Sequence, residues 1–144
     1  MGDAPPDTPS IESAAPQFLV ERLDVSLAFY EDRLGFSRDF VYEGFYAGVS
    51  RDRALIHLKC APKLAAERAH RRAADHLDAY LQVSGIDRLH AELVARGASI
   101  ARPLERQPWG THDFHVVDPD GYILCFSERE GTIRGPERRA RRRE

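Results

Sequence analysis

The fold is decided by the stretch VERLDVSLAFY at residues 20–30, which recurs 63 residues later as VSGIDRLHAEL at residues 83–93. Valine, aspartate and alanine fall at matching places in the two copies. In each copy an apolar strand comes first, and a helix with apolar residues three to four apart follows it and ends at Gly35 or Gly97. Because a repeat constrains a fold more than any local propensity does, the rest of the chain is interpreted from this match.

A second match, at an offset of 68 residues, covers the segment behind each helix. It aligns Tyr46 with Phe114 and His57 with Cys125, among other pairs. The turn Asp118-Pro119-Asp120-Gly121 is typical of a β-hairpin. The sequence therefore predicts an α+β fold of two tandem βαβββ modules. The expected strands cover residues 17–21, 37–42, 45–50, 54–60, 79–83, 99–103, 112–117 and 122–127.

The domain boundaries follow from composition. The chain has 144 residues, of which 42% are hydrophobic, enough for one domain-sized core. We expect a single domain at residues 16–130, with modules at 16–60 and 77–127 and an Ala- and Arg-rich linker helix at 61–76. Residues 1–15 and 131–144 lack hydrophobic content, so we expect a disordered N-terminal tail and a basic C-terminal tail.

Charge and hydropathy exclude several classes of partner. Residues 129–144 hold seven Arg and three Glu, a charge of +4 that leaves −6 on the rest of the chain. Because no basic and aromatic face accompanies this tail, we expect no nucleic-acid partner. No run approaches the roughly 18 apolar residues of a membrane helix, and the N-terminus does not resemble a secretory signal. We therefore expect a cytoplasmic protein without a membrane partner, in which both cysteines are reduced.

Two modules of this kind, with Asp24 to Tyr30, Gly35-Phe36, the Asp-Pro-Asp-Gly hairpin and Gln107-Pro108-Trp109-Gly110, resemble the vicinal oxygen chelate superfamily. The resemblance covers about residues 16–128 and is strongest to its glyoxalase and bleomycin-resistance type. It implies curved mixed sheets around a cupped cavity, and a homodimer. The Pro-Trp-Gly stretch is more similar to the drug-binding resistance proteins than to the lyases.

The same resemblance implies positions for a metal, on the first and last strand of each module. These positions fall on Ala15 or Gln17, His57, Asp78 and Cys125. Alanine cannot bind a metal, Cys125 has apolar neighbours, and a catalytic metal usually has three or more protein ligands. We therefore expect no cofactor. The alternative is a glyoxalase-like lyase or isomerase, or a dioxygenase, with a divalent metal at His57, Asp78 and Cys125; a metal-free enzyme would use His57 as a general base.

The function that this resemblance favours is binding without catalysis. A planar or cationic small molecule, such as a bleomycin-like antibiotic, would be sequestered in a cavity or dimer groove, and the negative body of the protein favours a cationic guest. The structural alternatives are core packing for the aromatic strand residues, a hydrogen-bonded strand histidine for His57 and a sheet-edge carboxylate for Asp78. The candidate ligand-binding residues are His57, Asp78, Phe45, Tyr46, Trp109 and Phe114.

Overall fold

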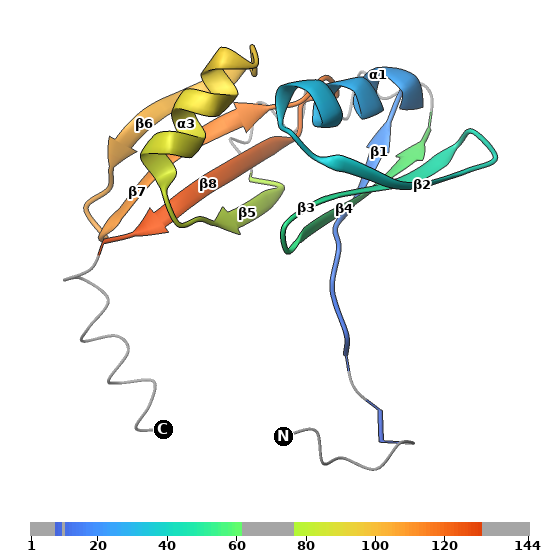
Figure 1. The fold of residues 1–144 in the computed structure, drawn as a ribbon, viewed down its shortest axis with the longest axis horizontal. Coiled ribbons are helices and arrows are strands. Elements are labelled where there is room, and N and C mark those ends of the chain that lie inside the picture. Colours follow the sequence, from blue (N-terminus) through green and yellow to red (C-terminus); the bar gives the residue numbers. More distant parts are fainter. Residues whose placement is uncertain (1–7, 10, 62–76, 131–144) are drawn as a thin grey trace.

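A computed structural model describes residues 8, 9, 11–61 and 77–130. They form two four-stranded mixed sheets that lie side by side, each with a helix on one face (Figure 1). The expected linker helix, apart from residue 61, and the basic tail from residue 131 lie outside the described residues. Among the described residues, neither helix has the length and apolar character needed to cross a membrane.

The order of elements is the same in the two modules. The first comprises β1 (Gln17–Val20), α1 (Leu23–Ala28), the π-helical turn η1 (Phe29–Arg33), β2 (Ser37–Tyr42), β3 (Tyr46–Arg51) and β4 (Ala54–Cys60). The second comprises β5 (Ala79–Gln82), α3 (Ile86–Ala95), β6 (Ile100–Arg106), β7 (Thr111–Val117) and β8 (Ile123–Arg129). The sheet orders β1-β4-β3-β2 and β5-β8-β7-β6 correspond strand for strand, which confirms the predicted pair of βαβββ modules.

Strand register confirms one part of the predicted repeat and corrects another. Gln17 pairs with His57 in the first sheet as Tyr80 pairs with Cys125 in the second, which is the expected equivalence. The third strand differs, because Ala47 pairs with Leu58 whereas Phe114 pairs with Phe126. These pairs make the offset between β3 and β7 67 residues, not 68.

The physical reason for this correction is the length of one turn. Two residues separate Arg51 from its strand partner Ala54, whereas in the second module three residues separate Asp118 from Tyr122, to whose carbonyl its N–H donates. Because side chains alternate along a strand, a slip of one residue moves every side chain to the opposite face. Tyr46 therefore corresponds to Asp113, and the counterpart of Phe114 is Ala47.

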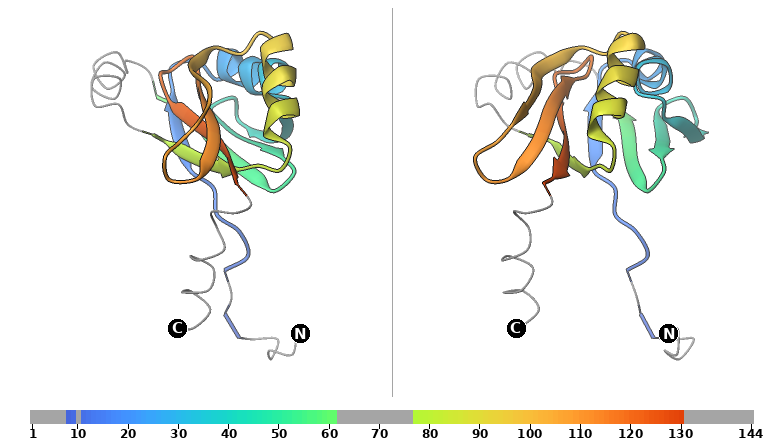
Figure 2. Two further views of the ribbon diagram at one scale, coloured as in Figure 1. Left: turned by 90° about the vertical axis from the view of Figure 1, so that its left-hand side faces the viewer. Right: turned by 60° about the vertical axis from the view of Figure 1, so that its left-hand side comes forward.

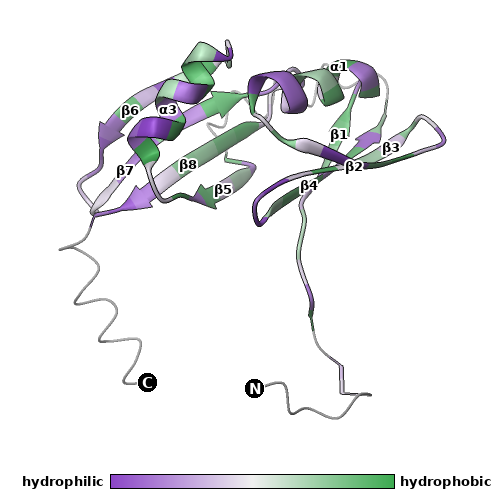
Figure 3. Ribbon diagram, viewed as in Figure 1, coloured by the Kyte–Doolittle hydropathy of each residue, from purple (hydrophilic) through white to green (hydrophobic). Residues whose placement is uncertain are grey.

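The core lies between the sheets and their helices. The helix residues Leu27, Tyr30 and Leu34 are buried, as their spacing predicts, and both helices alternate between hydrophobic and hydrophilic residues (Figure 3). The strand residues that face the helices belong to one core cluster shared by the modules. They include Phe18, Val20, Ala47, Val49, Ile56, Leu58, Phe114, Val116, Leu124 and Phe126.

The modules meet where the two helices end, next to each other (Figure 2). The Arg33 guanidinium donates to the carbonyls of Arg96 and Gly97, and Arg96 donates to the carbonyl of Asp32. Arg33 and Arg96 are 63 residues apart, so this contact is reciprocal under the repeat. Gly35 and Gly97 both have positive φ, and a Cβ would come against the guanidinium groups of Arg51 and Arg96 at Gly35 and of Arg33 at Gly97. Glycine is therefore favoured at both positions by its backbone conformation, while the guanidinium groups beside it are the flexible ends of their side chains.

Candidate functional site

Each sheet has a second face on which the described residues place no helix, and we call it the helix-free face. In the first sheet this face holds Gln17 of β1, Tyr46 and Gly48 of β3, and His57 of β4, which alternate with residues of the core. Phe40 of the edge strand β2 lies over it, in contact with the rings of Tyr46 and His57. The face therefore brings together aromatic, amide and imidazole groups.

A chain of hydrogen bonds links three of these side chains. The Tyr46 hydroxyl lies 2.7 Å from His57 Nδ1, and Gln17 Nε2 donates to the same hydroxyl at 3.2 Å. The Tyr46 and His57 rings are nearly perpendicular, with centroids 5.4 Å apart. His57 is half-buried, so its imidazole is held in place at the surface of the sheet.

The position of Phe40 depends on a glycine. The Phe40 ring packs directly on Gly48, where a Cβ would overlap the ring atoms. Phe40 is nearly parallel to Tyr46, at 24° and 5.9 Å between centroids, and meets His57 edge to face at 5.6 Å. The ring is nonetheless 41% exposed. Exposed aromatic rings packed this closely form a surface on which a planar ligand can stack.

The helix-free face of the second sheet has different chemistry. Its central residue is Asp113, which is only 5% exposed and accepts hydrogen bonds from Gln107 Nε2 at 3.0 Å and from Thr111 Oγ1 at 3.0 Å. Ser127 Oγ donates to the same carboxylate at 3.4 Å and itself accepts from the Tyr80 hydroxyl at 2.9 Å. Among the described residues no Lys or Arg forms an ion pair with Asp113, so neutral donors alone satisfy its charge.

Cys125 lies on the same face as Asp113 and is not poised for chemistry. Its side chain is buried, and burial first and the charge of Asp113 second raise the pKa of the Cys125 thiol to about 12. The thiol is therefore protonated at neutral pH, whereas the thiolate is the form that acts as a nucleophile or binds a metal.

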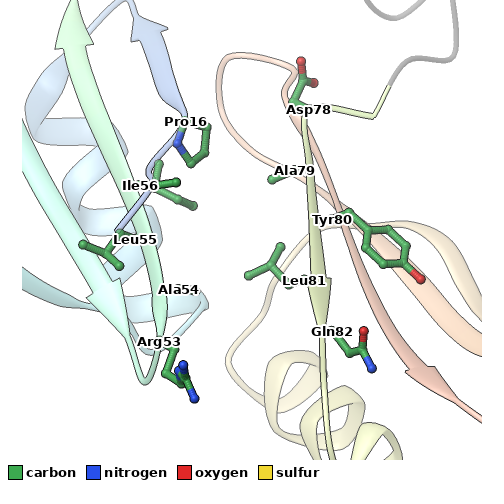
Figure 4. Close-up of a pocket in the computed structure, with 11 residues that line it drawn as sticks. Pro16, Arg53, Ala54, Leu55, Ile56, Asp78, Ala79, Tyr80, Leu81 and Gln82 are labelled. Atoms are coloured by element: carbon green, nitrogen blue, oxygen red, sulfur yellow. The ribbon is translucent and has the colours of Figure 1, made fainter. Parts of the chain in front are cut away.

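A pocket opens between the two modules. It has a volume of about 450 Å³ and lies between the first half of β4 and the edge strand β5. Ala79 and Leu81 point across it towards Pro16 and Ile56, while Tyr80 points away (Figure 4). Its walls are mostly apolar, and its other lining residues include Arg53 and Asp78.

Asp78 is at the rim of this pocket and also fastens β5 to β8. Its carboxylate accepts from the backbone N–H of Ile123 at 2.9 Å, and its own N–H donates to the Ile123 carbonyl at 2.8 Å. The structural alternative for Asp78, a sheet-edge carboxylate, thus describes its contacts, and the same residue lines the pocket.

The other sequence-predicted site residues divide into three groups. His57 and Tyr46 are in direct contact, as described above. Trp109 is 65% exposed in the turn between β6 and β7, and Phe45 is exposed beside Tyr42. The expectation for Phe114 fails, because this residue is fully buried in the core, stacked on Phe126. The one-residue slip in the predicted repeat accounts for this error.

The described residues do not assemble the alternative metal site. Among the described residues no three His, Cys, Asp or Glu side chains come together in a way that could hold a metal. The parallel register places Gln17 beside His57, and Tyr80 rather than Asp78 beside Cys125. A phenol that donates to Ser127 and a protonated thiol are poor ligands for a divalent ion. These residues therefore do not fit the metal that the resemblance implies.

Comparison with known proteins identifies the family. The sequence pattern of the glyoxalase/bleomycin resistance protein/dioxygenase superfamily matches residues 13–126. The chain belongs to this superfamily. No curated protein sequence matches it. Its membership confirms the resemblance found in the sequence, including the βαβββ modules.

Solved structures of the superfamily share the fold. The bleomycin-binding protein from bleomycin-producing Streptomyces verticillus, in complex with copper(II)-bleomycin, is 26% identical, with a TM-score of 0.63 over 86% of this chain and 99% of that one. A bleomycin resistance determinant encoded on the transposon Tn5 is 23% identical, with a TM-score of 0.68 over 83% and 99%. A glyoxalase-related enzyme from Clostridium phytofermentans is 22% identical, with a TM-score of 0.66 over 85% and 98%. A bleomycin-binding protein, a bleomycin resistance determinant and a glyoxalase-related enzyme thus share one scaffold with this chain.

Three site residues of this superfamily member were not assigned a ligand-binding role from the sequence. Gln17 was considered only as a metal ligand, and Phe40 and Asp113 were not considered. The glycine at position 48, inside β3, is a sequence signal that another group such as Phe40 packs there, because a glycine within a strand often marks a close approach by another group. Only Thr111, two residues earlier on the same strand, is a local donor to Asp113, since the other donors come from a turn and a neighbouring strand.

Proposed function

We propose that this protein binds a planar small molecule of the bleomycin type without converting it. The observation that carries the proposal is the helix-free face of the first sheet, where Phe40, Tyr46 and His57 form an exposed aromatic surface with a fixed polar group. Such a surface supplies both stacking and orientation, which are sufficient for sequestration. The 26% identity to a protein solved with copper(II)-bleomycin supports the same ligand class.

The charge distribution favours a ligand that carries a positive group. Asp113 holds a negative charge that no arginine or lysine of the described residues neutralises. Tyr80, half exposed beside it, offers an aromatic face to a cation. A ligand with a planar part and a cationic part would then use both sheets.

We further propose that the binding protein is a homodimer. Exposed aromatic side chains such as Tyr42, Phe45 and Trp109 flank the two helix-free faces. Exposed apolar groups of this size mark interaction sites in soluble proteins. A second copy would enclose each face in a groove. Analytical ultracentrifugation at micromolar concentration checks this, and a monomer at every concentration would contradict it.

Isothermal titration calorimetry with bleomycin and copper(II)-bleomycin tests the binding proposal. We expect saturable binding of about one ligand per chain and a change in Trp109 fluorescence. Phe40→Ala should weaken binding roughly 5- to 10-fold, the equivalent of one aromatic contact. Val25→Ala, on the exposed side of α1, is the matched control and should bind as the wild type does. If neither form of bleomycin binds, the proposed ligand class is wrong.

We also expect protein purified without chelators to hold no stoichiometric metal. The strand partner of His57 is Gln17, and the residue equivalent to His57 in the second module, Cys125, is a protonated thiol. Elemental analysis measures this directly. About one metal per chain, lost in His57→Ala, would favour the glyoxalase-like alternative instead.

A further inference from the structure

The hydrogen bonds around Tyr46 bear on which ring nitrogen of neutral His57 carries the proton. An amide N–H can only donate, so the Tyr46 hydroxyl accepts from Gln17 Nε2. The single proton of that hydroxyl is then available for His57 Nδ1, 2.7 Å away. When the hydroxyl donates this proton, Nδ1 is the acceptor and the imidazole proton lies on Nε2.

The second ring nitrogen of His57, Nε2, has no hydrogen-bond partner in the part of the chain that the structure describes. Among the described residues no group accepts a hydrogen bond from Nε2. The ring is half-buried, with Phe40 and Tyr46 packed against it. A donor held beside an exposed aromatic ring and left unsatisfied by the protein is a feature that a ligand can use.

We propose that His57 Nε2–H is the hydrogen-bond donor that selects ligands on the helix-free face of the first sheet. The ligand class is an aromatic or heteroaromatic ring that stacks on Phe40 and carries an acceptor, such as a carbonyl oxygen or an unprotonated ring nitrogen, at its edge. This inference rests on the proposed function and names its specificity element. Tyr46 and Gln17 act through His57 and are positioning residues.

The shape of the sheet supports this arrangement. Gly48 pairs with His57 across the β3–β4 ladder, and its missing side chain allows the Phe40 ring to lie flat at this point. Phe40 and His57 therefore meet edge to face at 5.6 Å, on one side of the strand pair. Stacking and hydrogen bonding are offered a few ångströms apart, as recognition of one substituted ring requires.

The tautomer is measured without any ligand. In ¹⁵N-labelled protein, long-range ¹H–¹⁵N correlation spectra should show His57 as the Nε2–H tautomer, with the signal assigned by its loss in His57→Gln. Tyr46→Phe should shift the Nδ1 resonance and mix the tautomers. Tyr42→Phe removes a hydroxyl from the outer end of the same hairpin and should leave the spectrum unchanged. An Nδ1–H tautomer in the wild type would overturn the inference.

The role of the donor is measured by titration with bleomycin. His57→Leu should lower affinity about 10-fold, whereas His57→Gln, whose amide can still donate, should stay within about 3-fold of the wild type. Equal affinity of His57→Leu and wild type would also overturn the inference. Failure of bleomycin to bind the wild type contradicts the proposed function instead, and the ligand-free spectrum still decides the position of the proton.

Discussion

The two modules share a core and differ on their helix-free faces. At equivalent strand positions the first module has Gln17, Tyr46 and His57, and the second has Tyr80, Asp113 and Cys125. The helix-facing positions remain apolar in both modules. Burial therefore preserves hydrophobic character on one face of the duplicated unit, while the other face is free to acquire a neutral hydrogen-bonding relay in one copy and a buried charge in the other.

The contacts at the ends of equivalent strands show the same divergence. Arg51, at the end of β3, makes a two-point ion pair with Glu92 of the second module. Asp118, its counterpart after β7, accepts a hydrogen bond of 2.8 Å from the Tyr30 hydroxyl of the first module. The first contact is partly exposed and the second is buried. Equivalent strand ends thus join the two modules by an ion pair in one case and by a buried hydrogen bond in the other.

The largest expected effect concerns the thiol that replaces His57 in the second module. With a pKa of about 12, Cys125 is about one part in ten thousand thiolate at pH 8, and it is buried. Cys60, which is partly exposed, should react with a disulfide reagent in the native protein, while Cys125 waits for unfolding. Mass spectrometry of the labelled sites measures this, with Cys60→Ser as control. Rapid native labelling of Cys125 would show that the second face is open.

The next effect compares a buried phenylalanine of the second module with an exposed one of the first. Phe114→Ala should lower the free energy of unfolding by about 3–5 kcal/mol, because the ring is fully buried against Phe126. Phe45→Ala, which truncates the same ring at an exposed position, should cost well under 1 kcal/mol. Urea denaturation compares them. Similar costs for the two substitutions would contradict the assignment of Phe114 to the core.

A smaller effect is the pH dependence contributed by Asp118. Burial raises the pKa of this carboxyl to about 6, above its ordinary value of 3.8. The native state therefore binds the proton more tightly than the unfolded state, and the stabilisation is lost as pH rises from about 4 through 6, by up to about 3 kcal/mol. Subtracting the profile of Asp118→Asn from that of the wild type isolates this contribution. Parallel profiles between pH 4 and 7 would rule it out.

The smallest effect has the opposite sign with pH. Hydrogen bonding from Arg51 lowers the pKa of Glu92 to about 2, so this stabilisation is present above pH 4.5 and is lost as pH falls towards 2. Because a third of the Glu92 side chain is exposed, solvent screens the pair, and Arg51→Met should cost only about 1 kcal/mol at neutral pH. Thermal unfolding at pH 7 and pH 3 measures both values. A larger cost at pH 3 than at pH 7 would contradict the ion-pair origin.

Much of the fold could be predicted because it rests on local patterns and an internal repeat. The strands Ser37–Tyr42 and Ala54–Cys60 have the predicted limits, and Gly35 has the positive φ expected at the end of a helix. These features depend on residues close together in the chain, where spacing, turn propensity and alternation act directly.

The candidate site could be predicted less completely, since its contacts join strands that are far apart in the sequence. His57 and Tyr46 could be chosen as inward residues of a cavity, but their bond to Gln17 arises only when β1 pairs in parallel with β4. Phe40 depends on the absence of a side chain at Gly48, across a different strand pair.

The sequence by itself determined that two βαβββ modules form and which superfamily they belong to. Only the tertiary structure decided which side chains of β3 and β7, the third strand of each module, face the core. The cause is one additional residue in the turn at Asp118. The physical reason is the two-residue period of a β-strand. Secondary structure survives a shift of one residue in register, whereas the assignment of side chains such as Phe114 and Asp113 to core or surface reverses completely.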